Sequence, residues 1–167
     1  MTAPTALDRI GVLLAQVAKV QPRLPTGVHQ EAIAVGWATV ELDRAAVELA
    51  AELDLSPDGF RAASASPVLG ARCLVANALL PGRLAFALLE PSTEGRLAAS
   101  LARFAEGPAV VWLAEPRLSA GLTGGRASGG ELPTAEVGPF GAERLILGGP
   151  RHGPYWLVLD WVGIIRS

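Results

Sequence analysis

Short apolar runs bounded by glycine, proline and polar residues recur along the chain and predict buried β-strands. The prominent runs lie at residues 31–42, 71–79, 84–90 and 109–113, and shorter ones lie at 136–137, 144–147 and 155–159. Pro91 ends the third run because proline cannot donate to a sheet ladder. Leu80-Pro81-Gly82-Arg83 predicts a hairpin between the second and third runs, with Gly82 free to adopt a positive φ.

Two stretches show helical spacing instead. Leu97, Leu101 and Phe104 recur at intervals of four and three, between a capping Ser92 or Thr93 and the terminator Gly107-Pro108. A second helix is predicted near residues 43–54, where Asp43 is the expected cap and the apolar positions again follow a 3.6-residue period: Ala46, Leu49, Ala50 and Leu53.

The start of the chain is ambiguous on periodicity alone. Ile10–Leu14 is an apolar run that could form a strand, followed by a helix over Ala15–Val20 that ends before Pro22. The same residues also fit one helix from Leu7 to Val20, with Leu7, Ile10, Leu14 and Val17 on one side.

Composition narrows the class of protein. The 167 residues suffice for one domain or two small modules, half of them are apolar, and the net charge is −2. No basic patch with interleaved aromatics is present, so we expect no nucleic-acid partner. Asp8 and Arg9 interrupt any signal-peptide core, and Asp160 breaks the apolar run from Tyr155 to Ile165, so we expect a cytoplasmic protein without a membrane partner.

Nucleophilic catalysis has little support in the sequence. Cys73 is the only cysteine, it lies in an apolar run without a neighbouring base, and no GxSxG motif is present. The two histidines are His29, whose strand face also carries Glu31, and His152, in a turn beside Arg151. The glycine-rich segment 121–130 matches neither a P-loop nor GxGxxG, so we expect a flexible loop there.

The order Leu88-Leu89-Glu90-Pro91, helical stretch, Glu106-Gly107 and strand resembles the middle of the vicinal oxygen chelate superfamily, which includes glyoxalases and methylmalonyl-CoA epimerases. Leu7–Leu13 resembles the superfamily's opening strand. The resemblance implies an α+β fold of two βαβββ modules that form a cupped mixed sheet, with an inserted helix in the first module. It implies a first module over residues 1–92, a helical linker over 93–107 and a second module over 108–167.

The resemblance also implies a divalent cation held by one side chain from each of four strands. The matching positions here are Arg9, Ala87, Val110 (or Ala109 with a one-residue shift) and Leu157. Arginine stays protonated and the other side chains carry no donor atom. We therefore expect a degenerate member of the superfamily, with no metal and no cofactor.

Strand alternation from those positions predicts the side chains that face the cup: Arg9, Gly11 and Leu13; Ala85, Ala87 and Leu89; Val110 and Trp112; Tyr155, Leu157 and Leu159. This face is apolar apart from Arg9 and the Tyr155 hydroxyl, which fits either a filled core or a small-molecule pocket. The candidate ligand-binding residues are Arg9, Trp112, Tyr155, Arg151 and His152. Arg9 would reach the rim, pair with Asp8, Glu143 or Asp160, or bind an anionic ligand.

Three functions follow as hypotheses. The first is a metal-independent binding protein for a small, largely apolar ligand that can carry a carboxylate. The second is a metal-dependent lyase, epimerase or dioxygenase-like enzyme of the same superfamily with displaced ligands. The third is a dimeric structural or interaction protein with a filled core. Homodimerisation is expected from the superfamily and from the apolar run Trp161–Ile165.

Overall fold

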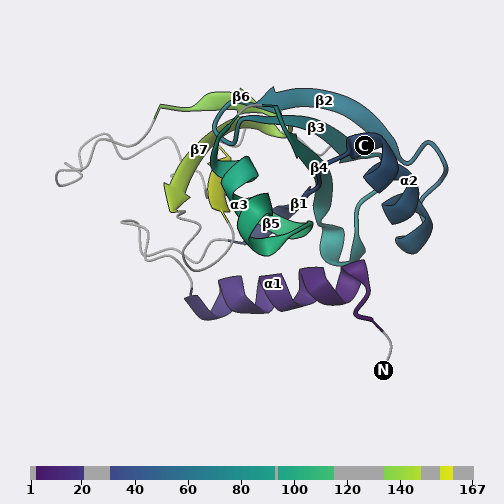
Figure 1. The fold of residues 1–167 in the computed structure, drawn as a ribbon. Coiled ribbons are helices and arrows are strands. Elements are labelled where there is room, and N and C mark those ends of the chain that lie inside the picture. Colours follow the sequence, from purple (N-terminus) through teal and green to yellow (C-terminus); the bar gives the residue numbers. More distant parts are fainter. Residues whose placement is uncertain (1–2, 21–30, 93, 115–133, 148–154, 160–167) are drawn as a thin grey trace.

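The computed structural model describes residues 3–20, 31–92, 94–114, 134–147 and 155–159. These residues form three α-helices and one sheet, and Figure 1 shows the helices packed around the curved sheet. In chain order the elements are α1 (Ala6–Val20), β1 (Ala32–Ala38), α2 (Leu42–Glu52), β2 (Phe60–Ser66), β3 (Ala71–Ala76), the 3-10 turn η1 (Pro81–Arg83), β4 (Ala85–Pro91), α3 (Arg96–Phe104), β5 (Gly107–Ala114), β6 (Glu136–Gly138), β7 (Gly141–Leu147) and β8 (Tyr155–Leu159).

Within the described ranges the sheet has eight strands in the order β2-β3-β4-β1-β5-β8-β7-β6, and its two halves repeat one topology. In each half the first strand pairs in parallel with the last, and the remaining pairs are antiparallel. An antiparallel pairing of β1 with β5 joins the halves. This mixed α+β architecture confirms the predicted fold class. Gly82 has a φ of 78°, as its predicted place in the turn before β4 requires.

Alternation along the strands divides the core between two faces. The outer face packs against α1 and α2 and includes Val35, Trp37, Val111 and Leu113. The opposite face, called the cup face here, includes the predicted inward residues Ala87, Leu89, Val110, Trp112, Tyr155 and Leu157, and Ala85 packs against them. Side chains from one end, the centre and the other end of the sheet meet on the cup face, so this side is concave.

The expectation of a strand at Leu7–Leu13 is wrong, because these residues belong to α1. The buried positions of α1 follow intervals of four, three and four, which is the helical period: Ala6, Ile10, Leu13 and Val17. Thr5 and Asp8 cap the helix reciprocally through Thr5 Oγ1 and Asp8 Oδ2. Arg9, Gly11 and Leu13 therefore do not belong to the cup face, and the single-helix alternative matches the structure.

The helix expected near residues 43–54 forms as α2 and connects β1 to β2. It thereby takes the helix position of a βαβββ unit, and the helix beyond that pattern is α1. The sequence pattern predicts no strand at residues 60–66, where β2 forms largely from small alanine and serine side chains with low strand propensity. α3 lies within the segment expected to link the two halves.

Candidate functional site

The described part of the cup is filled by its own side chains. Trp112 is completely buried, and a Cβ atom on Gly36 would lie 2.9 Å from its ring and 2.6 Å from Leu89 Cδ1. The indole and Leu89 therefore occupy the space above Gly36. Phe140 packs edge-on against the indole, with ring centroids 5.0 Å apart. Of the two alternatives for this face, the packing around Trp112 fits a filled core.

A buried carboxyl lies within this apolar face. Glu143 of β7 has no exposed surface, and its Oε2 accepts a hydrogen bond of 2.7 Å from Trp112 Nε1. Its Oε1 accepts a second bond from Ser66 Oγ of β2. A Cβ on Gly138 would lie 2.2 Å from the carboxyl carbon, so glycine is required there. Burial raises the pKa of Glu143 although both hydrogen bonds oppose the rise.

From the sequence, Glu143 is expected only as a candidate partner for Arg9, and that pairing is wrong. The available signal was alternation, because Leu145, two positions further along β7, packs against the cup face. Glu143 therefore lies on the same side of β7 as Leu145, and its side chain is directed into the core.

The structure brings Trp112 and Tyr155 together on the cup face, since Tyr155 pairs with Val110 on the neighbouring strand. The Tyr155 hydroxyl donates a hydrogen bond of 2.7 Å to the carbonyl of Arg96 in α3. Burial raises the pKa of this hydroxyl, and the nearby charge of Arg96 opposes the rise. Arg151 and His152 lie outside the described residues.

The side chains of the cup face do not fit the cation that the resemblance implies. Ala87, Val110 and Leu157 are on this face and have no donor atom, whereas Arg9 lies elsewhere on α1. In the described ranges, no three histidine, cysteine or acidic side chains gather closely enough to hold a metal ion.

The thiol of Cys73 is buried on the cup face. Burial raises its pKa to about 12, which leaves the thiol protonated and unreactive at neutral pH.

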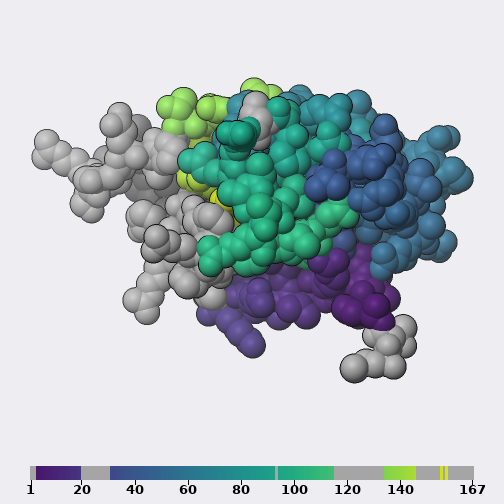
Figure 2. Space-filling model, in the orientation of Figure 1, coloured from purple at the N-terminus to yellow at the C-terminus, as the bar shows by residue number. Residues whose placement is uncertain are grey.

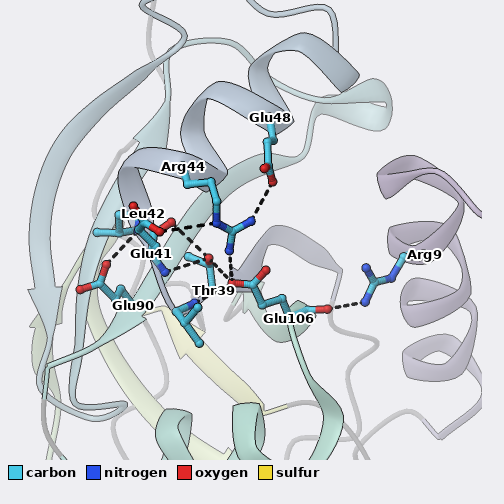
Figure 3. Close-up of polar contacts among 9 residues, drawn as sticks. Arg9, Thr39, Glu41, Leu42, Arg44, Glu48, Glu90 and Glu106 are labelled. Atoms are coloured by element: carbon cyan, nitrogen blue, oxygen red, sulfur yellow. Dashed lines mark hydrogen bonds and ion pairs between the residues drawn. The ribbon is translucent and has the colours of Figure 1, made fainter.

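A polar network joins the turn before β5 to the start of α2 (Figure 3). Glu106 Oε1 accepts hydrogen bonds from Thr39 Oγ1 at 2.7 Å, Val40 N at 2.8 Å and Arg44 Nη2 at 2.6 Å. Partial burial raises the pKa of Glu106, but the bonds from Arg44, Val40 and Thr39 outweigh it and lower the pKa to about 2. Arg44 also contacts Glu41 and Glu48 of its own segment, and its bond to Glu106 ties the start of α2 to the turn before β5.

Arg9 approaches this network from α1, as Figure 3 shows. Its Nη2 donates to the backbone carbonyl of Glu106 at 2.5 Å, and its guanidinium carbon lies 4.7 Å from the ring centroid of Trp37. A Cβ on Gly107 would lie 2.1 Å from Nη2, so the absence of a side chain there allows the contact. Arg9 thus does not point into the cup. The expected pairing with Asp8 is wrong too, because Asp8 bonds Thr5.

Arg9 also lines an open groove of about 320 Å³ beside α1. The purple atoms along the lower edge of Figure 2 are those of α1. The other groove residues are mostly apolar: Pro4, Val12, Leu13 and Pro108, with Asp8 and Gln16. Within the described part of the chain, Nε and Nη1 of Arg9 make no hydrogen bond. The groove therefore combines apolar walls with a cation that retains hydrogen-bonding capacity.

No family model and no curated protein matches this chain. Solved structures match in fold. A hypothetical protein from Bacillus halodurans is similar with a TM-score of 0.57 at 13% identity, covering 83% of this chain and 99% of that one. The methylmalonyl-CoA epimerase of Mycobacterium tuberculosis gives 0.55 at 21%, covering 76% and 85%. A methylmalonyl-CoA epimerase in complex with methylmalonyl-CoA and NH4+ gives 0.51 at 17%, covering 78% and 95%.

These likenesses establish the fold, which this chain shares with methylmalonyl-CoA epimerases. No helix in the described ranges is both long enough and apolar enough to cross a membrane.

Proposed function

We propose that this chain is a metal-independent member of the vicinal oxygen chelate superfamily that binds a small, largely apolar carboxylate in the groove beside α1. The observation that carries the proposal is the position of Arg9 beside Pro4, Val12, Leu13 and Pro108, where its Nε and Nη1 make no hydrogen bond to any described residue. A planar guanidinium matches a carboxylate in charge and geometry. The filled cup supports a site elsewhere on the molecule.

The groove is large enough for a small molecule, and the guanidinium of Arg9 is held in a fixed position beside it. Its volume of about 320 Å³ is at the lower end of the range for ligand pockets. Contacts to the Glu106 carbonyl and the Trp37 ring hold the guanidinium in place, which lowers the entropy lost on binding. Asp8 is the nearby opposing charge, and its carboxylate already accepts two bonds from Thr5. The groove volume and the positioned guanidinium favour an anion with a short apolar body, and the charge of Asp8 opposes it.

Calorimetric titration with straight-chain and aromatic carboxylates, each matched with its primary amide, tests the proposal. We expect wild-type protein to bind the acids more tightly than the amides, because only the acids pair with the guanidinium. Arg9→Met should lose roughly tenfold or more of the affinity for acids, the equivalent of one charge-assisted hydrogen bond, and little of that for amides. The control is Arg61→Met, since Arg61 is an exposed arginine on the distant strand β2.

Equal affinity of wild type and Arg9→Met for every acid would contradict the carboxylate assignment. If acid binding survives Arg9→Met but is lost in Val12→Asp, the groove is the binding site but Arg9 does not bind the carboxylate. Circular dichroism of each variant checks that the fold is intact.

Homodimerisation is the second candidate function. Leu7 and Val12 are large apolar residues on α1 with 42% and 60% of their surface exposed. Val12 adjoins Pro4, Leu13 and Pro108 in the groove, and contiguous exposed apolar residues are typical of a partner surface. Light scattering at micromolar concentration should give twice the chain mass, and Val12→Asp should restore the monomer mass. A monomeric wild type would contradict this candidate.

A further inference from the structure

The two ends of the eight-stranded sheet meet across the cup. β2 and β6 are its terminal strands, and Figure 1 shows them side by side at the top of the molecule. Glu143, on the strand next to β6, bonds Ser66 of β2. The same carboxyl bonds Trp112 of the central strand β5. Ser66, Trp112 and Glu143, called the clasp here, therefore connect both ends and the centre of the sheet.

The hydrogen bonds of the clasp make its stability depend on the charge of Glu143. Ser66 Oγ donates to Oε1 while it accepts the backbone N–H of Leu69, and Trp112 Nε1 donates to Oε2. Both donors are neutral, and no lysine or arginine of the described ranges lies within ion-pair distance of the carboxyl. An ionised Glu143 is thus a buried charge without a counter-ion in this part of the chain, which is costly.

The other groups around Glu143 favour its neutral form. Glu136 of β6 repels a negative charge on Glu143. Cys73 of β3 interacts with Glu143, and its thiol is neutral at physiological pH because its pKa is raised to about 12. Arg144 follows Glu143 on β7, and strand alternation directs it to the opposite face. A protonated Glu143 retains both contacts, since its O–H can donate to Ser66 Oγ while its other oxygen accepts from Trp112.

We propose that the clasp is a proton-controlled closure of the cup, sealed while Glu143 is protonated and loosened between β2 and β7 when the carboxyl ionises. Glu143 has its pKa raised in the folded protein, so its contribution is complete at pH values below the ordinary range of glutamate. That contribution is lost as the pH rises through the raised value. The device is independent of the groove beside α1.

Cys73 provides a clean probe, because it is the chain's only cysteine and its side chain is buried on the cup face. The rate of its alkylation by iodoacetamide is measured from pH 4 to pH 9 in wild type and in Glu143→Gln. Glutamine keeps the geometry without ionising: its amide nitrogen donates to Ser66 and its carbonyl accepts from Trp112. Dividing the two rates removes most of the thiol's own titration.

We expect the ratio of the wild-type rate to the Glu143→Gln rate to rise, by up to about tenfold per pH unit, between the ordinary range of glutamate and the raised pKa of Glu143, and to level off above it. Ser66→Ala, which removes one donor, should raise the alkylation rate at every pH. Glu136→Gln is the matched control and should keep the pH dependence of the wild type, displaced to lower pH, because it removes the charge that repels an ionised Glu143. Hydrogen exchange should show the added opening in β2 and β7 and not in β1.

A ratio that stays flat across this pH range would overturn the proposal. So would equal protection of β2 and β7 from hydrogen exchange at pH 5 and pH 8. If Glu143→Gln does not fold, the exchange measurement on wild type and Ser66→Ala decides the question, because each protein then carries the same titrating carboxyl.

Discussion

Gly36 is the residue that allows the cup face to fill. A Cβ at this position would overlap Leu89 Cδ1 at 2.6 Å and the Trp112 ring at 2.9 Å. The indole has little freedom to move away, because its Nε1 bonds Glu143 and Phe140 packs against it. Because Gly36 has no side chain, the indole of Trp112, the largest fully buried side chain, can occupy the space above it.

Gly36→Ala should lower the free energy of unfolding by about 1 to 3 kcal/mol, because overpacking forces the indole or Leu89 out of position. Gly11→Ala is the matched control. A Cβ on Gly11 meets nothing within 4 Å, and alanine raises helix propensity in α1, so this variant should gain up to about 1 kcal/mol. Urea denaturation measures both values. Equal stability of Gly36→Ala and wild type would show that the indole does not occupy this space.

Single residues also mark the limit of prediction from sequence. Alternation placed Trp112 and Tyr155 on the cup face correctly, because period-two burial is a local property. Glu143 was missed as a cup residue because its partner Ser66 lies 77 positions away on a strand that the sequence did not indicate. Arg9 was placed in the cup because a resemblance to an opening strand outweighed the helical period of the same residues.

At the scale of elements, α2 is held by carboxylates from distant strands. Its N-cap residue Glu41 makes no side-chain capping bond. The backbone N–H of Leu42 instead donates to Glu90 Oε2 at the end of β4, and Glu106 accepts from Val40 just before the helix. Both carboxylates lie near the N-terminus of α2, where their negative charge interacts favourably with the positive end of the helix dipole. Asp43, the predicted cap, lies inside the first turn instead. The prediction is wrong because short-range capping rules cannot detect a partner 48 positions away.

Glu106→Gln should lower the free energy of unfolding at pH 7 by about 1 to 2 kcal/mol, because charge-assisted bonds to Arg44 and to Val40 are weakened. The folded pKa of Glu106 is about 2, below the ordinary value of 4.5. Its stabilisation is therefore complete above pH 4.5 and is lost as the pH falls towards 2. The difference between wild type and Glu106→Gln should shrink over that interval in urea denaturation.

Glu48→Gln is the control for this experiment, since Glu48 pairs with the same Arg44 from an exposed position. Exposed ion pairs contribute little, so we expect a change within about 0.5 kcal/mol. Similar losses in both variants would show that the network before β5 has no special role in holding α2.

At the scale of the whole molecule, the two halves of the sheet repeat one strand order without a matching repeat in sequence. The apolar runs predicted most of the strands, and the fold class followed from their order and from the Leu-Leu-Glu-Pro resemblance. The position of α1 could not be derived, because nothing local states which sheet face an amphipathic helix covers. The pairing of β1 with β5 joins residues 69 to 81 positions apart and is likewise beyond local patterns.

The side chains at the positions expected to bind a metal ion determine what the whole protein should contain. Ala87, Val110 and Leu157 are buried at three of the four positions that the resemblance assigns to ligands, and none offers a donor atom. Glu143 is the buried carboxyl of the described cup, and its two oxygens already accept bonds from Ser66 and Trp112. Elemental analysis of protein purified without a tag should therefore find no stoichiometric zinc, nickel, cobalt or manganese. Stoichiometric metal that disappears in His29→Ala or Glu31→Ala would instead favour an enzyme of this superfamily with displaced ligands.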